Sequence, residues 1–238
     1  MFDEPSTRKH IFGRRFDPQG VPVRDATFDA PDSDEPVVAL DPLGGFIAAW
    51  RQAVWSSKTT FRPGLFMRRL DAFGEGLGKS TWVSGDGAFA NAPSVAGLPS
   101  GSLLLWYDFG GMFARRYSHG GTPLGDPVLV DDQGGESTIL PTADGATCSC
   151  TGGTSPDLDG EIRMRTHGPS GELRAEAMVS DDFDFTDAAL APAEDVAAAV
   201  GIDVLDPDLP PTDVVVQRLR STARSSVVAS WCTVRRTV

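Results

Sequence analysis

A short pattern that recurs along the chain limits its possible folds more than any other feature. Its first copy, Ile11 to Val23, reads IFGRRFDPQGVPV. The same order of apolar, arginine, acidic and glycine positions returns in three further copies and begins a weaker fifth: Leu65 to Leu77, Met112 to Leu124, Ile162 to Leu173, and from Val214. The copies lie roughly 50 residues apart, which is a period typical of repeat proteins.

Each copy is predicted to form a β-hairpin. The apolar and aromatic residues of Phe12 to Phe16, with arginines between them, suit a pleated and partly buried strand. Asp17 and Pro18 stand at the first and second positions of a turn, and Gly20 stands at the fourth, where a positive φ is needed. This order of residues indicates a type I turn followed by a bulge.

A second element recurs out of step with the first. Pro36 to Trp50, PVVALDPLGGFIAAW, contains two short apolar runs around a turn and therefore predicts another hairpin. Its equivalents are Pro93 to Trp106, Ser137 to Cys150, and Asp187 to Val200. The second run, such as Phe46 to Trp50, is apolar without alternation, which indicates a strand covered on both faces. Val37 to Leu40, Trp50 and Trp106 are expected in the core.

The two hairpins together place four strands in about 50 residues, a spacing typical of β-propeller blades. The sequence therefore predicts an all-β protein, a β-propeller of four to five four-stranded antiparallel blades, either as a closed ring or as a fragment of a larger one. Residues 1–238 are predicted to be one propeller domain. Its blade units are 9–35 (partial), 36–84, 93–131, 137–180 and 186–220, followed by an irregular or truncated terminal strand in 221–238.

The repeats resemble bacterial tandem repeats of the type IFxRRFDxxGxPxG … PxVAxLxxGGFVVAW, found in large extracellular or surface proteins. The resemblance covers about residues 9–220. It implies propeller blades and a location outside the cell or at its surface. It implies almost nothing about activity, because such folds host unrelated functions. The first ten residues, MFDEPSTRKH, lack the hydrophobic region of a signal peptide, so we expect either an intracellular protein or the interior of a longer exported chain.

Charge argues against several classes of partner. The formal net charge is −12, whereas binding of nucleic acid or of an anionic membrane surface needs a basic patch. No apolar run approaches the 18 residues of a membrane span. We therefore expect neither nucleic acid nor a membrane-spanning segment, and no cofactor other than a Ca²⁺ ion.

The long connections between the hairpins collect acidic residues, whereas the tight turns lie at the opposite end of each sheet. Binding residues concentrate on loops held by a rigid scaffold, so any site is predicted at the connection end. The candidate Ca²⁺ ligands are Asp181, Asp182, Asp184, Asp203, Asp206 and Asp208. Solvated turns are the alternative for these residues, because their spacing matches no EF-hand. The candidate ligand-binding residues are Trp55, Tyr107, Asp131 and Asp132.

The paired arginines, such as Arg14 and Arg15, recur because the blade recurs. Neighbouring side chains of a strand point to opposite faces. One arginine of each pair is therefore predicted to bond a neighbouring blade or an acidic loop, and the other to meet water.

The favoured function is a non-catalytic binding or adhesion module whose acidic, loop-rich face holds a cation, a glycan or a protein. The alternative is a carboxylate-based, glycosidase-like hydrolase with its site on the same face, which needs two carboxyl groups across a cleft. The chain contains no S-x-D-x-G-x-x-W, G-x-S-x-G or H-E-x-x-H motif. Open strand edges, if present, are expected to promote self-association.

Overall fold

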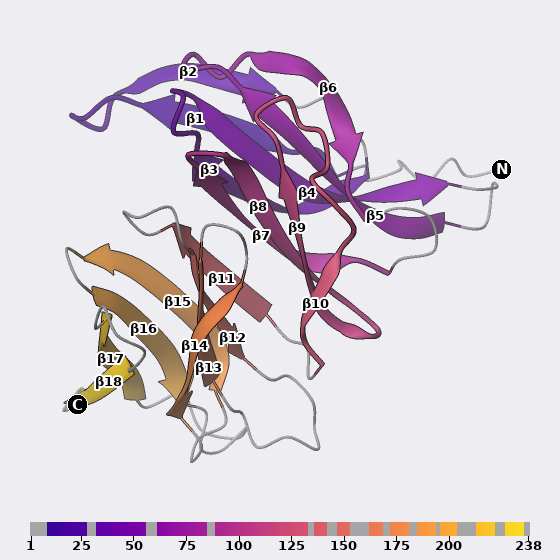
Figure 1. The fold of residues 1–238 in the computed structure, drawn as a ribbon. Coiled ribbons are helices and arrows are strands. Elements are labelled where there is room, and N and C mark those ends of the chain that lie inside the picture. Colours follow the sequence, from indigo (N-terminus) through magenta and orange to yellow (C-terminus); the bar gives the residue numbers. More distant parts are fainter. Residues whose placement is uncertain are drawn as a thin grey trace, which may run out of the picture. The chain divides into compact units, whose positions relative to one another are not determined.

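In the computed structural model of the chain, every regular element in the described residues is a β-strand (Figure 1). The described residues are 9–27, 32–55, 61–84, 89–132, 136–141, 147–152, 162–168, 172–180, 185–193, 196–203, 213–221 and 227–235. The chain forms two compact units, which are described separately below. Unit 1 holds residues 1–104 and 116–125, and unit 2 holds residues 105–115 and 126–238.

The strands group into one two-stranded sheet and four four-stranded sheets, each with its strands in chain order. The first sheet pairs β1 (Phe12–Phe16) with β2 (Pro22–Thr27). The second holds β3 (Ser33–Leu40), β4 (Phe46–Trp55), β5 (Phe61–Leu70) and β6 (Gly76–Trp82). The third holds β7 (Asn91–Leu98), β8 (Gly101–Asp108), β9 (Gly111–Tyr117) and β10 (Val128–Asp131).

The last two sheets belong to unit 2. One holds β11 (Glu136–Pro141), β12 (Thr147–Gly152), β13 (Ile162–His167) and β14 (Leu173–Ser180), and the other holds β15 (Phe185–Ala193), β16 (Val196–Asp203), β17 (Asp213–Ser221) and β18 (Val227–Arg235). The predicted repeat of four-stranded antiparallel sheets is thereby confirmed. The prediction that residues 221–238 are irregular or truncated is wrong for β18, which pairs with β17 from Asp213 to Ser221. Its apolar run resembles an inner strand, but the short interval after β17 makes it the outer strand of a simple hairpin.

The predicted turns are present in the first three copies. Gly20, Gly74 and Gly121 have φ of +79°, +87° and +77°. The amide of each donates to the carbonyl three residues earlier, for example from Gly20 to Asp17 at 3.0 Å. The Asp17 carboxylate also accepts the amides of Gln19 and Val21, at 2.9 and 2.8 Å. Asp at the turn start and Gly at its end thus fix the hairpin register.

A second glycine position is required by close packing of the backbone. Gly45 directly precedes β4 with φ of +128°, and Gly101 begins β8 with φ of +138°. A Cβ added at Gly45 would lie 2.3 Å from the Leu70 carbonyl oxygen, and one at Gly101 would lie 1.9 Å from that of Tyr117. Only glycine therefore allows the turn and the third strand to approach this closely.

The core follows the prediction for β4 and β8 but not for β3. Trp50 and Trp106 are both buried, and they stack on Phe66 and Phe113 with ring centroids 6.4 and 6.2 Å apart. Val38 and Leu40 were also expected in the core, and this expectation is wrong. They lie on the face of β3 opposite to the one that packs on β7, and no described strand of unit 1 covers that face.

The buried tryptophans make the sheet core sensitive to truncation. Changing Trp106 to Ala should lower the free energy of unfolding by about 3 to 5 kcal/mol, because a large aromatic leaves a cavity that neighbours fill only in part. Urea denaturation of the two proteins measures this difference. The matched control is Phe73→Ala, since the Phe73 ring is exposed in the turn after β5 and its removal should have little effect. Equal losses for the two variants would contradict the assignment of Trp106 to the core.

Candidate functional site

The two ends of the sheets in unit 1 differ in character. One end carries the tight turns after β1, β3 and β5, and we call it the turn end. The other carries the starts of β3 and β7 and the end of β4, and we call it the connection end. The contacts made by the residues at each end show which end is available to bind a partner.

The turn end is held together by arginines that reach from one sheet to the next. Arg15 donates to the carbonyl of Ala72 at 2.6 Å, and Arg69 donates to the carbonyl of His119. Both acceptors occupy the second position of the turn in the next repeat. Arg69 also pairs with the buried carboxylate of Asp41, with 2.7 Å from Nε to Oδ2. The prediction that one arginine of a pair bonds a neighbouring blade is confirmed for Arg15 and Arg69.

The first arginine of each pair behaves less uniformly. Arg14 lies at the surface and forms a bidentate pair with Asp25, its partner across β1 and β2. Arg68 donates to the carbonyl of Gly78 in its own sheet. In the fourth copy Thr166 replaces the second arginine, and the single Arg165 is buried between Asp131 and Glu176.

The connection end carries a group of charged side chains that we call the Asp34 cluster: Lys9, Asp34, Glu35 and Arg51. Arg51 closes a bidentate pair on Asp34, with N–O distances of 2.7 and 2.8 Å, and its Nη1 lies 3.1 Å from Glu35. Lys9 Nζ lies 3.4 Å from Asp34 Oδ2. Asp34 and Arg51 face each other across β3 and β4, so the sheet fixes their geometry. Both remain partly open to solvent.

The backbone around the cluster adopts a conformation that side chains disfavour. Asp32, Glu35 and Ala92 have φ of +57°, +49° and +47°, and they are the only non-glycine residues with positive φ in the described ranges. Glu35 and Ala92 occupy the same repeat position, each directly before a proline. The Glu35 carboxylate accepts the amide of Ala92 at 2.7 Å, which joins the starts of β3 and β7. Positive φ at non-glycine residues recurs at ligand-binding sites.

The charges of the cluster fix its protonation state. The hydrogen bonds from Arg51 lower the pKa of the Asp34 carboxyl; partial burial opposes this effect, and Lys9 adds to it. Asp34 in turn raises the pKa of Arg51. Asp34 is therefore an anion at neutral pH, and it offers a charged hydrogen-bond acceptor beside the Arg51 guanidinium rather than a carboxylic acid that could donate a proton.

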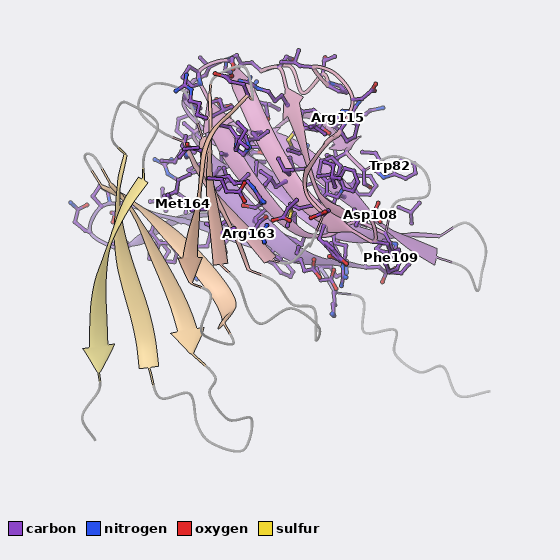
Figure 2. All side chains as sticks on the ribbon, turned by 60° about the horizontal axis from the view of Figure 1, so that its bottom comes forward. Trp82, Asp108, Phe109, Arg115, Arg163 and Met164 are labelled. Atoms are coloured by element: carbon purple, nitrogen blue, oxygen red, sulfur yellow. The ribbon has the colours of Figure 1, made fainter. Side chains whose placement is uncertain are left out.

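The residues predicted as ligands are not gathered in one place by the structure. Trp55 is the last residue of β4, and Tyr107 is half-buried in β8. Asp132 is exposed just after β10. Asp131 is buried and bonded to Arg165, so its proposed role in ligand binding gives way to a structural one. The connection between β8 and β9 presents Asp108 and the exposed Phe109 ring close together (Figure 2).

The candidate calcium ligands fall largely outside the described residues. Asp181, Asp182, Asp184, Asp206 and Asp208 lie there, and of Asp203 only the backbone is described, at the end of β16. Within the described ranges no group of three or more His, Cys, Asp or Glu residues could hold a metal ion. The calcium hypothesis stays a prediction.

Unit 2 also buries a histidine, His167 on β13. His167 is buried, and its burial lowers the pKa of the imidazole; the neighbouring Arg165 lowers it further and Glu172 raises it. The ring is thus held neutral in the folded state.

The lowered pKa of His167 should make stability depend on pH. Neutral His167 contributes fully to the free energy of unfolding above pH ~6.5, which is the pKa of histidine in the unfolded chain. This contribution is lost as the pH falls toward the lower pKa of His167 in the folded protein, because the unfolded chain takes up the proton first. Thermal unfolding between pH 7.5 and 5 should therefore show a falling midpoint that His167→Gln makes flatter. The exposed His10 supplies the control variant His10→Gln, and an equal flattening in both variants would contradict this account.

The fold can be compared with solved structures. A neuraminidase-like protein of subtype N11 from a flat-faced bat matches with a TM-score of 0.56 and 11% identity, over 83% of this chain and 51% of that one. A protein of unknown function from Dyadobacter fermentans matches with a TM-score of 0.53 and 11% identity, over 85% of this chain and 79% of that one. A GH43 β-1,3-galactosidase matches with a TM-score of 0.50 and 12% identity, over 96% of this chain and 49% of that one.

These similarities concern the fold alone. They identify the chain as an all-β protein with a β-propeller fold, as predicted. The chain spans about half the length of the neuraminidase-like protein and of the galactosidase. No protein-family model and no curated protein sequence matches it. The described part of the chain contains no long apolar helix of the kind that crosses a lipid bilayer.

Proposed function

We propose that the protein is a non-catalytic binding module that holds a glycan at the connection end, on the Asp34 cluster. The observation that carries this proposal is the bidentate pair between Arg51 and Asp34, which is fixed by the sheet and still partly open to solvent. Charged groups held in place before binding form hydrogen bonds to a ligand at a lower entropic cost. Sugar hydroxyls, which both donate and accept hydrogen bonds, suit a site that combines a guanidinium with carboxylates.

The turn end is the less suitable surface. Its repeated arginines Arg15 and Arg69 already donate hydrogen bonds to the turns of the next sheets, and the Asp41 carboxylate is already paired with Arg69. A ligand there would have to displace contacts that join the sheets. At the connection end, by contrast, Lys9 and Glu35 are exposed enough for a ligand to bind without breaking the sheet.

Chemistry within the cluster supports binding over hydrolysis. Hydrolysis of a glycosidic bond needs one carboxyl group that is protonated and can donate to the leaving group. Asp34 is held as an anion by Arg51, so it does not supply that proton. The similarity to a GH43 β-1,3-galactosidase is one of fold, and it serves here only to choose the first glycan to test.

Calorimetric titration with a β-1,3-linked galacto-oligosaccharide tests the proposal on the full chain. Binding should weaken by ~10-fold or more in Arg51→Ala and in Asp34→Asn, corresponding to about 1.4 kcal/mol each. Arg68→Ala is the matched control, because Arg68 donates to the Gly78 carbonyl of its own sheet and does not belong to the Asp34 cluster, and it should bind normally. Equal binding by all variants would place the glycan elsewhere.

Two further outcomes would contradict the proposal. If the unmodified chain binds none of a panel of neutral and acidic oligosaccharides, the site is not a glycan site. If the chain releases free sugar and Asp34→Asn abolishes the release, the protein is a hydrolase. A melt of each variant confirms that any loss of binding does not come from unfolding.

A further inference from the structure

We propose that the first sheet accepts a β-hairpin from a separate polypeptide segment, which adds to the free edge of β1 and covers the exposed face of β3. This proposal does not depend on the glycan site, because it concerns a different surface of unit 1. It rests on a comparison between the repeats within this one chain. In that comparison, two strands are present in the second and third sheets and have no equivalent beside β1 in the described residues.

The first observation is the edge of β1. In the second and third sheets the equivalent strands, β5 and β9, have a neighbour on each side, whereas β1 pairs only with β2 in the described residues. Phe16 is therefore 54% exposed, although its equivalents Leu70 and Tyr117 are buried. Phe12 is also exposed, whereas its equivalent Phe66 lies between the rings of Trp50 and Trp82. The edge thus lacks the strand that would carry the stacking tryptophan.

The second observation comes from β3 and is independent of the first. Val38 is 67% exposed, whereas its equivalent Val95 in β7 is only 7% exposed. Val95 is covered because β7 packs on β3 and β4 of the preceding sheet. This packing is close: a Cβ added at Gly97 would lie 2.0 Å from the Leu40 carbonyl oxygen. Within the described residues of unit 1, no strand covers β3 in the same way from the side of the first sheet.

A single β-hairpin could cover both the free edge of β1 and the exposed face of β3. A hairpin of the kind formed by β7 and β8 would place one strand against β1, completing its hydrogen bonds, and the other strand beyond it. Its outward face would then lie on Val38 and Leu40, as β7 lies on β3. The segment that fits has two short apolar strands joined by a tight turn, a tryptophan opposite Phe12, and small residues along the strand that meets β3.

A second copy of this chain is the less suitable donor. Its hairpins of this kind, β3–β4, β7–β8, β11–β12 and β15–β16, all belong to complete four-stranded sheets. Donating one would remove two strands from a sheet, and in the second and third sheets it would remove the buried Trp50 or Trp106. A separate segment that carries an unpaired hairpin has no such cost. We therefore assign the site to a hairpin outside residues 9–235 rather than to a dimer.

The probe is a dye-labelled peptide with the sequence of residues 91–107, NAPSVAGLPSGSLLLWY, added to the full chain and followed by fluorescence anisotropy. Binding should saturate, and the double variant Phe12→Asp, Phe16→Asp should weaken it by at least ~10-fold, because it places charges against an apolar strand. The matched control is Phe73→Asp, since Phe73 is similarly exposed but lies in the turn after β5. It should bind the peptide normally.

Hydrogen exchange on the same complex identifies the surface. Amides of residues 12–16 should exchange more slowly when the peptide is bound, and those of β17 should not change. A scrambled peptide that binds as well, or protection that appears away from β1 and β3, would overturn the proposal. A concentration-dependent dimer that the Phe12→Asp, Phe16→Asp variant abolishes would also overturn it, since a second copy would then be the occupant.

Discussion

The arrangement of unit 1 depends on the hydrogen bonds that Arg15 and Arg69 each donate to the turn of the next sheet. Arg15 and Arg69 each reach the carbonyl at the second position of a turn. That carbonyl is presented in the right place because an Asp or Ser begins the turn and a Gly with positive φ ends it. Asp41, which is almost fully buried, is acceptable in the interior only because Arg69 neutralises it. The motif that repeats in the sequence is therefore also the contact that joins the sheets.

This use of the turn end leaves the connection end for function. The same sheets that are joined by turns and arginines at one end carry the Asp34 cluster and strained backbone at the other. The strain at Glu35 and Ala92 is maintained by the hydrogen bond between them. The contacts between sheets at the turn end make the scaffold rigid. Binding residues are therefore expected at the connection end, where the charged side chains remain partly exposed.

Much of this could be predicted from the sequence, because turns and buried strands leave local signals. Asp17 and Gly20 identify a turn by themselves, and the uninterrupted apolar run ending at Trp50 identifies a covered strand. The exposure of Val38 could not be predicted in the same way, since it depends on whether another strand covers β3. Likewise the burial of Asp131 depends on Arg165, which lies more than thirty residues away in the sequence.

The Asp34 cluster shows where sequence reasoning fell short. Asp34 and Glu35 end one of the acidic connections, but the sequence gives no local sign that Arg51 lies beside them. The register of the β3–β4 hairpin, counted from Leu40 opposite Phe46, would place Glu35 across from Arg51. A bulge between Asp34 and Val37 instead brings Asp34 to that position. Bulges of this kind have little local signature, and the Glu before a proline was the only hint.

The central claim is that the connection end binds and the turn end holds the sheets together. Hydrogen exchange of the full chain with and without a bound β-1,3-linked galacto-oligosaccharide measures this most directly. The account predicts slower exchange at residues 32–35, 51–55 and 89–92, with no change at the turns of residues 17–20, 71–75 and 118–122. Protection confined to those turns, with none around Asp34 and Arg51, would contradict it.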